Sequence, residues 1–359
     1  MTRPRQKKEI FPILDAKLQS IATALPKYEI HQTEVESFAR RLFASRSKTF
    51  ERLSGAYANA GIDRRYSSVP LGWYEQPHGW KDRTKIFVES ALDLLEKAGR
   101  LAINRAGISL NDIDGIVTVT STGLAVPSLD ALLMERMAFR RDVHRLPIFG
   151  LGCGGGVLGL SRTAALAKAQ PGTRWLFLVV ELCGITFREG DLSKSNIIAT
   201  ALFGDGAAAA VVQADTDGKR LAQWGEYCWP NSLDVMGWEI EDDGLGVQFS
   251  RDIPQLVRTQ MREAADCFLQ KSLLPFQRVD DFVFHPGGAK VLTALEEAFE
   301  IPSPGLTCAR DVLRNFGNMS AATVLFVLEQ TLAQQPKGVA LMGALGPGFT
   351  AGFLILDDD

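Results

Sequence analysis

Residues 149–157 read FGLGCGGGV, a short apolar run that meets a glycine-flanked cysteine just before a helix-like segment. Glycines on both sides of Cys153 allow a tight turn and leave its sulfur approachable. A thiol at the start of a helix meets the positive end of the helix dipole and free N–H groups, and both favour the nucleophilic thiolate. The pattern also fits a small buried residue beside a glycine loop. No lysine follows the glycines, as a phosphate-binding P-loop would require.

Strand-like and helix-like segments alternate around this stretch, as in an α/β fold. Residues 84–102 carry apolar side chains at helical spacing and end before Gly107, which predicts an amphipathic helix. The other predicted segments are strands at 115–120, 146–149, 175–180, 207–212, 281–284, 339–342 and 352–356, and helices at 158–169, 253–269, 289–299 and 321–332. Residues 1–85 read as a mixed, partly helical leader. We therefore predict two similar halves, 1–214 and 215–359, packed as one body.

The composition of the 359 residues is that of an ordinary globular protein. With 46% apolar and 23% charged residues, it excludes disordered, collagen-like and disulfide-scaffold classes. The formal net charge of -3 argues against a strongly basic surface of the kind that binds nucleic acid. No run of apolar residues reaches the ~18 residues that a membrane-spanning helix needs. The five cysteines form no CxxC pair, which argues against a zinc site and a disulfide framework. We expect a cytoplasmic protein that holds no metal.

Two further segments could complete a cysteine-based active site. A cysteine nucleophile needs an imidazole partner on a rigid element, and among four histidines only His285 follows a buried, strand-like run. Ligands bind at the carboxyl ends of strands in open α/β sheets, although His285 could equally be a satisfied core residue. Residues 315–320, NFGNMS, precede a helical run and either cap that helix or aim an amide inward. An amide beside an imidazole would form an oxyanion hole for an enolate or an alkoxide.

These motifs, in the order cysteine, histidine, asparagine, make the chain resemble the type III polyketide synthases, the chalcone synthase-like branch of the thiolase superfamily. Five blocks in register carry the resemblance: Gly152-Cys153 with its glycine run, LFGDGAAA at 202–209, HPGG at 285–288, FGNMS at 316–320 and GPG at 346–348. It implies an α/β, thiolase-like αβαβα layered fold with two duplicated halves, and a homodimer. It also implies that an acyl-CoA starter acylates Cys153. His285 and Asn318 would then assist decarboxylation of malonyl-CoA and hold the enolate for a Claisen condensation.

The resemblance extends to the expected walls of the substrate cavity. Phe203 matches the family's gate residue, and Val247 falls near the position of a second gate phenylalanine. The small side chain of Val247, and Leu345 in place of a phenylalanine, imply more room. The segment around Trp238 looks like microbial enzymes that accept long acyl chains and release alkylpyrones or alkylresorcinols, so we expect a fatty acyl starter. The other positions that match cavity-lining residues are Thr122, Cys183, Thr186 and Ser320.

Positions that match coenzyme A contacts are only partly present. Lys48 and Arg52 match basic residues that hold the phosphates, although both also fit a solvated face, and Gly287 and Gly288 belong to the same expected binding site. Val126 matches the tip of a loop that reaches across the dimer interface. The implied substrates are acyl-CoA and malonyl-CoA, and no resident cofactor is expected.

Several rival functions fit parts of the pattern. A chain-initiating β-ketoacyl-acyl carrier protein synthase uses the same three catalytic residue types, Cys, His and Asn. Its histidine is typically followed by Gln-Ala-Asn, whereas Pro286-Gly287-Gly288 follow the histidine here. A hydroxymethylglutaryl-CoA synthase needs a catalytic glutamate near the thiol, and we interpret Glu181, the acid of note in that region, as structural. A non-catalytic thiolase-fold partner would not need all three catalytic residue types. A dinucleotide-dependent oxidoreductase lacks the GxGxxG spacing.

Overall fold

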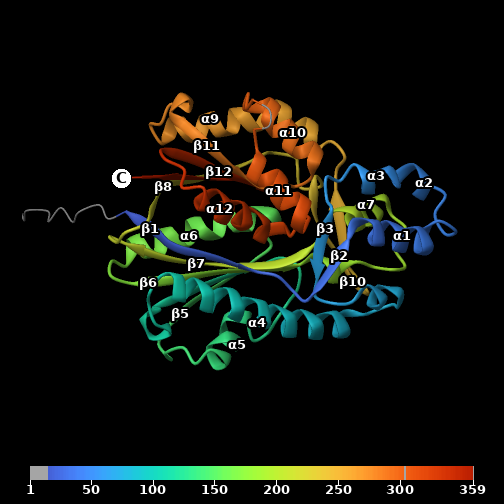
Figure 1. The fold of residues 1–359 in the computed structure, drawn as a ribbon, viewed down its shortest axis with the longest axis horizontal. Coiled ribbons are helices and arrows are strands. Elements are labelled where there is room, and N and C mark those ends of the chain that lie inside the picture. The colour runs from blue at the N-terminus through green and yellow to red at the C-terminus, as the bar shows by residue number, and fades with distance from the viewer. Residues whose placement is uncertain (1–14, 303–304, 359) are drawn as a thin grey trace, which may run out of the picture.

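The computed structural model describes residues 15–302 and 305–358, whose strands and helices are shown in Figure 1. The strands are β1 (Ala16–Ala24), β2 (Tyr28–His31), β3 (Arg64–Ser67), β4 (Gly115–Thr120), β5 (His144–Phe149), β6 (Arg174–Leu182), β7 (Asp205–Ala214), β8 (Lys219–Cys228), β9 (Met236–Glu241), β10 (Gly244–Phe249), β11 (Val279–Phe284), β12 (Val339–Gly346) and β13 (Thr350–Asp357). The α-helices are α1 (Gln32–Phe43), α2 (Phe50–Leu53), α3 (Gly55–Ala58), α4 (Trp80–Arg105), α5 (Leu129–Arg136), α6 (Gly155–Ala169), α7 (Lys194–Leu202), α8 (Ile253–Leu256), α9 (Arg262–Lys271), α10 (Ala289–Ala298), α11 (Thr307–Phe316) and α12 (Thr323–Ala333). Three short 3-10 turns matter for the site: η3 (Gly152–Gly154), η4 (Cys183–Thr186) and η7 (Ser320–Ala322).

The strands and helices are arranged in five layers, as the αβαβα prediction requires (Figure 1). The main sheet has nine strands in the order β11-β12-β13-β8-β1-β7-β6-β4-β5. Its two halves are joined only by a short pairing, in which residues 16–18 of β1 lie beside residues 219–221 of β8. Helices α6 and α12 fill the layer between the halves, while α4 with α5 and α9 with α10 cover the outer faces.

The two halves of the sheet repeat one pattern of strand directions. In the first half, β4 runs parallel to β6, and β6-β7 and β7-β1 are antiparallel. In the second half, β11 runs parallel to β12, and β12-β13 and β13-β8 are antiparallel. This repeat agrees with the predicted duplication. The domain boundary at residue 214 stays a prediction, although β7 ends at Ala214 and β8 starts at Lys219.

The core forms where apolar strands are covered on both faces. β7 is rich in alanine and is buried along almost its whole length, because α4 lies on one side of it and α6 and α12 lie on the other. The predicted helix at 84–102 is α4, whose buried residues include Phe87, Ala91, Leu94 and Ala98 at helical spacing. Within the described residues, no helix has both the length and the apolar character needed to cross a membrane.

The described part of residues 1–85 is mixed and partly helical, as predicted, with α1, α2 and α3 beside β1, β2 and β3. Residues 16–24 form β1, a central strand that pairs antiparallel with β7. Its burial comes from neighbours about 190 residues away in the sequence, so local spacing of apolar residues could not reveal it. The first 14 residues of this segment, with the apolar Ile10, Ile13 and Leu14, lie outside the described residues.

Candidate active site

Cys153 lies in η3, between the edge strand β5 and the start of α6. Gly150 and Gly152 adopt the left-handed conformations, φ 91° and 47°, that let the chain turn from the strand into the helix. The Gly152 N–H donates to Ser121 Oγ at 2.8 Å, which fixes this turn against the segment after β4. A Cβ atom at Gly156 would clash with the carbonyl oxygen of Ala321. The glycine run therefore lets α6 approach η7, which follows the asparagine of the site.

His285 follows the last residue of β11, at the carboxyl end of that strand. Its backbone N–H donates to the carbonyl oxygen of Gly343 on β12 at 2.9 Å, so the ring is held by the sheet. The residue is only 5% exposed, and neither ring nitrogen has a hydrogen-bond partner among the described residues. Burial lowers the pKa of His285 to about 3. The imidazole is therefore neutral near pH 7 and has one donor and one acceptor nitrogen to offer.

Asn318 lies in the turn between α11 and η7, after Gly317, whose φ is 69°. Its backbone N–H donates to Leu202 O at 2.8 Å, and its carbonyl accepts from Gly204 N–H at 3.0 Å, so the turn is joined to the chain around Phe203. Its side-chain Nδ2 donates to Gly287 O at 3.1 Å, and its Oδ1 accepts from the Ser320 N–H at 2.8 Å. These bonds fix the amide plane and tie it to the loop that follows His285.

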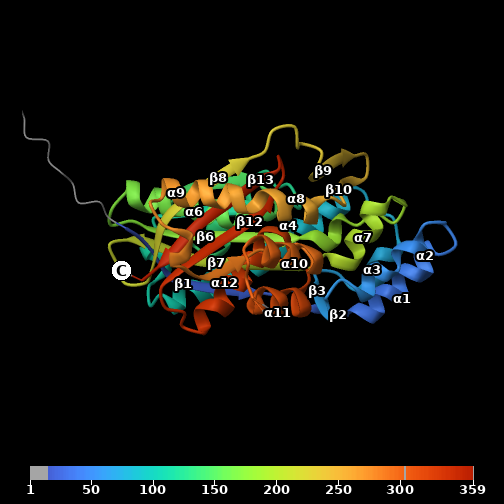
Figure 2. The same cartoon turned by 90° about the horizontal axis from the view of Figure 1, so that it is seen from above.

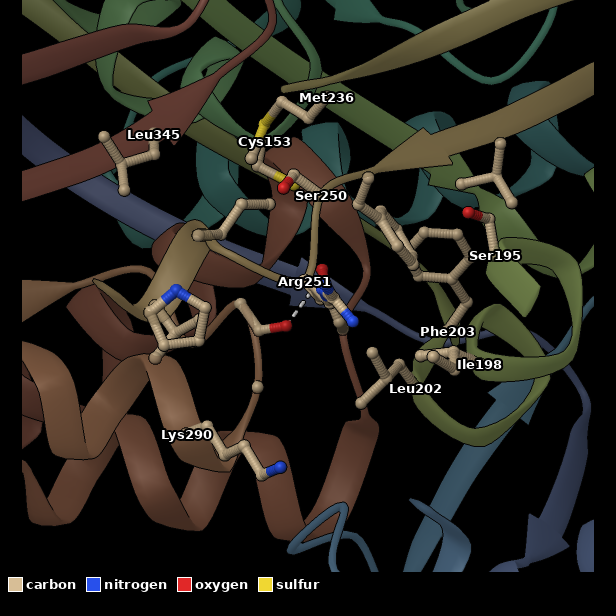
Figure 3. A pocket seen from close by; sticks show the side chains of 18 of the residues that line it. Cys153, Ser195, Ile198, Leu202, Phe203, Met236, Ser250, Arg251, Lys290 and Leu345 are labelled. Carbon is tan, nitrogen blue, oxygen red and sulfur yellow. Dashed lines mark hydrogen bonds between the residues drawn. The ribbon is translucent and has the colours of Figure 1, made fainter. Parts of the chain in front are cut away.

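A single cavity of about 910 Å³ brings these three residues together. Cys153, His285, Asn318 and Ser320 all lie on its wall, although they come from opposite halves of the sheet. Figure 3 shows Cys153 and Leu345 in the upper part of the cavity and Lys290 near its lower end. The wall also includes these residues expected from the sequence: Phe203, Trp238, Val247, Arg52, Gly287 and Gly288.

The electrostatic setting of the thiol differs from the prediction. The pKa of Cys153 is raised to about 12, first by burial and further by the nearby Glu181 carboxyl, while a hydrogen bond with Ser320 acts the other way. The helix start was expected to favour thiolate, but desolvation of the sulfur outweighs it. Thiol and imidazole are thus both neutral, and a nucleophilic attack by Cys153 requires a base such as His285 to take its proton.

Glu181 is fully buried at the end of β6. Its Oε2 accepts from the Ser121 N–H at 3.0 Å and from Thr122 Oγ1 at 2.8 Å, while Oε1 has no partner among the described residues. Burial raises the pKa of Glu181 to about 7. These bonds join Glu181 to the segment that also holds the cysteine turn, and its interpretation as a structural residue stays a prediction.

The comparisons with known proteins agree with this geometry. The N-terminal domain of the chalcone and stilbene synthases matches residues 14–216, and the C-terminal domain matches residues 223–357. The chain belongs to the chalcone and stilbene synthase family. It is 36% identical to a member from Bacillus subtilis (strain 168), covering 95% of this chain and 98% of the relative. It is 34% identical to the 1,3,6,8-tetrahydroxynaphthalene synthase of Streptomyces peucetius subsp. caesius, covering 94% and 92%.

Solved structures give the same result. PKS-I from the brown alga Ectocarpus siliculosus superposes with a TM-score of 0.90 at 25% identity, covering 98% of this chain and all of that one. The 1,3,6,8-tetrahydroxynaphthalene synthase of Streptomyces coelicolor A3(2), a bacterial type III polyketide synthase, gives a TM-score of 0.90 at 25% identity, covering 95% and 99%. The chain is thus a type III polyketide synthase, an acyltransferase with the thiolase-like fold, and the predicted family is confirmed.

Some residues expected on the wall of this chalcone synthase-like cavity lie elsewhere. Thr122 lines neither cavity, because its hydroxyl is held in the core by Glu181 and by the Leu182 N–H. Cys183 and Thr186 line a second, smaller cavity of about 70 Å³, and Phe203 and Val247 lie on the walls of both cavities. Cys183 and Thr186 are thus separated from the main cavity by the expected gate positions.

The cationic residues of the synthase also differ from expectation. Arg52, at the α2 turn, lines the main cavity, but Lys48 is exposed on the loop before that turn and does not. The sequence reasoning missed three further cations on the wall, namely Lys194, Arg251 and Lys290. Among the four cations on this wall, Arg251 is the one with a carboxylate of the described residues within 4.0 Å, that of Asp252. A usable signal existed for Lys290, which comes two residues after the HPGG motif.

Proposed function

We propose that this type III polyketide synthase loads a fatty acyl group from acyl-CoA onto Cys153, extends it with malonyl-CoA and cyclises the product to an alkylpyrone or an alkylresorcinol. The observation that carries the proposal is the meeting of Cys153, His285 and Asn318 on the wall of one large cavity. Pockets for small molecules span ~300–1,000 Å³, so this cavity is near the upper end of that range.

The loading step follows from the neutral thiol and imidazole. As the Cys153 sulfur attacks the thioester carbonyl of the starter, His285 takes the thiol proton, and the coenzyme A thiolate leaves and receives it. The acyl group is then held as a thioester on Cys153. The free ring nitrogens of His285 support this role, because the neutral imidazole has one nitrogen that can accept the proton.

The extension step uses the same residues as hydrogen-bond donors. Malonyl-CoA loses carbon dioxide, and the electron pair of the broken carbon–carbon bond forms an enolate whose oxygen is stabilised by N–H groups of His285 and Asn318. The enolate carbon attacks the Cys153 thioester, and the cysteine sulfur leaves. The fixed amide of Asn318 supports this role, since Gly287 O uses one of its two Nδ2 hydrogens and the side chain also interacts with the Cys153 thiol, where the acyl group is held.

The walls of the cavity support a fatty acyl starter. Large apolar side chains line most of it, and they come from α7, the β9-β10 hairpin and α10: Ile198, Leu202, Met236, Trp238, Val247, Phe249, Val291 and Leu295. Hydrocarbon chains bind such walls through burial of apolar surface. Relatives named 1,3,6,8-tetrahydroxynaphthalene synthase and phloroglucinol synthase, the latter from Pseudomonas fluorescens at 26% identity, make a small aromatic product the second candidate.

The phosphates of coenzyme A would be held by the cationic part of the wall. Arg52, Lys194, Arg251 and Lys290 come from four separate segments and supply positive charge to one cavity. Gly287 and Gly288, which precede Lys290 in the sequence, line the same cavity. The thioesters themselves provide the leaving group and the carbanion, so the proposed reaction needs no resident cofactor or metal.

We also propose that the protein is a homodimer that works in the cytoplasm. Exposed apolar side chains gather on the edge strand β5 and on the loop after β4, with Leu124, Val126, Leu146 and Phe149 among them. Val126 is fully exposed. A second copy that covers this edge would remove apolar surface and unpaired strand groups from water.

The proposal is tested by incubating the purified protein with malonyl-CoA and acyl-CoA starters from acetyl to stearoyl, with products identified by mass spectrometry. We expect pyrones or resorcinols from the long starters. Cys153→Ala should abolish condensation without a change in circular dichroism, whereas Cys267→Ala, an exposed cysteine on α9, should have no effect. Products from malonyl-CoA alone would favour the small aromatic. Activity only on carrier-protein-bound malonate would indicate the chain-initiating ketoacyl synthase instead.

A further inference from the structure

The β9-β10 hairpin is a wall of the main cavity that is separate from the main sheet. Among the strands that the structure describes, these two pair only with each other, and Figure 2 shows them beyond the end of the sheet and close to α7. Met236, Trp238, Val247 and Phe249 line the cavity near the open end of the hairpin. There Phe203 packs on it, with ring centroids 6.1 Å from Trp238 and 5.9 Å from Phe249. Because no main-sheet strand holds this wall, its position depends on other contacts.

Side chains from outside the hairpin hold its turn, residues 241–244. The Trp80 indole N–H donates to Glu241 O at 2.8 Å, and Arg83 Nε donates to Asp243 O at 3.0 Å. Arg188 donates through Nη1 to Asp243 Oδ1 at 3.0 Å and through Nη2 to Glu241 Oε1 at 3.4 Å. The turn is thus fixed by one indole and two guanidinium groups.

The same two arginines also hold the segments that face the hairpin. Arg83 donates to the carbonyls of Ile185 and Phe187, the latter at 2.7 Å, and so joins the hairpin turn to η4, which lines the second cavity. Arg188 also pairs with Asp191 at 2.8 Å, just ahead of α7. Both arginines therefore connect the hairpin to another wall of the substrate space.

The link from Arg188 continues into α7. Asn196, in the first turn of α7, donates through Nδ2 to the Arg188 carbonyl at 2.9 Å and to the Asp191 carbonyl at 2.8 Å. Further along the same helix, Ile198 and Leu202 line the main cavity. Arg188 is only 13% exposed, so its ion pairs are less screened by solvent than surface pairs are.

We propose that Arg188, supported by Arg83, is a positioning residue for starter selection. It sets the separation between the β9-β10 wall and the α7 wall, and through this separation the length and bulk of the acyl chain that the cavity accepts. The inference rests on the proposed function, because it concerns the same cavity and the same acyl-CoA substrates. Arg188 does not itself line the cavity, so it acts only through the walls that it joins.

The test is a chain-length profile. The ratio of kcat/KM for the preferred starter to kcat/KM for starters four carbons shorter or longer is measured in the wild type and in Arg188→Gln. We expect this ratio to fall on the order of tenfold, mainly through KM, which is the size of effect that one methylene group of misfit produces. A purely structural role would reduce the active fraction and lower kcat equally for all starters.

Matched variants keep the test decisive. Asp243→Asn removes the nearer of the two hairpin carboxylates that pair with Arg188, on a half-exposed turn, and should relax the profile in the same direction even if Arg188→Gln folds poorly. Arg188→Lys keeps the charge and should restore part of the selectivity. Arg140→Gln, which breaks a 2.7 Å pair with Asp114 away from both cavities, should leave the profile unchanged. An unchanged profile in Asp243→Asn and Arg188→Gln would overturn the inference, whereas a wild type that accepts no acyl-CoA would overturn the proposed function itself.

Discussion

Glu181→Gln is expected to remove a large part of the pH dependence of stability. The folded-state pKa of this fully buried carboxyl is about 7, against an ordinary value of 4.5. The folded protein therefore binds this proton more tightly than the unfolded chain does. The resulting stabilisation is fully present below about pH 4.5 and is lost as the pH rises through about 7. At ~1.4 kcal/mol per pKa unit, the wild type should lose on the order of 3 kcal/mol that the glutamine variant keeps.

The assay is urea unfolding followed by tryptophan fluorescence at pH 5, 6.5 and 8. The difference in unfolding free energy, variant minus wild type, should rise with pH. Asp205 is also buried and its pKa is raised to about 6, but it contributes equally to both proteins and cancels in the difference. Glu263→Gln, an exposed position on α9, serves as the control. Parallel pH profiles for the wild type and Glu181→Gln would refute the reasoning.

Two further predictions concern the cavity and the exposed edge. Val247→Phe should lower kcat/KM for stearoyl-CoA at least about tenfold more than kcat/KM for hexanoyl-CoA. Val247 lies on the walls of both cavities, so a phenyl ring there would narrow the space for a long acyl chain. An equal fall in kcat/KM for both starters, measured in the same kinetic series, would contradict this prediction. Val126→Asp should shift the protein from dimer towards monomer, because dimerisation would bury the new carboxylate at the apolar edge formed by β5 and the loop after β4. The molar mass is measured by light scattering after size exclusion. An unchanged mass would argue against that interface.

Local sequence patterns predicted the parts of the fold that depend on neighbours in the chain. The spacing of apolar residues in α4 gave a helix that the structure extends by a few residues at each end. The sequence also indicated Cys153 and His285. Both were recognisable from a few consecutive residues, because glycines mark the tight turn at the cysteine and an apolar run marks the strand that ends before the histidine.

The remaining features depend on residues that are distant in sequence. β1 is a strand because β7 lies beside it, and Thr122 turns away from the cavity because Glu181, about sixty residues later, binds its hydroxyl. The cations on the cavity wall come from α2, α7, the segment before α8, and α10, and no single motif contains them. The raised pKa of Cys153 is likewise a property of its burial, and the sequence around the cysteine indicated only the helix dipole.

The division of the site between the repeated halves has a consequence for folding. Cys153 belongs to the first half, whereas His285 and Asn318 belong to the second, and the start of α6 fits only when the turn at η7 lies against it. During synthesis the thiol therefore emerges well before the imidazole and the amide. The first half alone would contain a nucleophile without its base, so the docking of the two halves and the onset of catalytic competence are a single event.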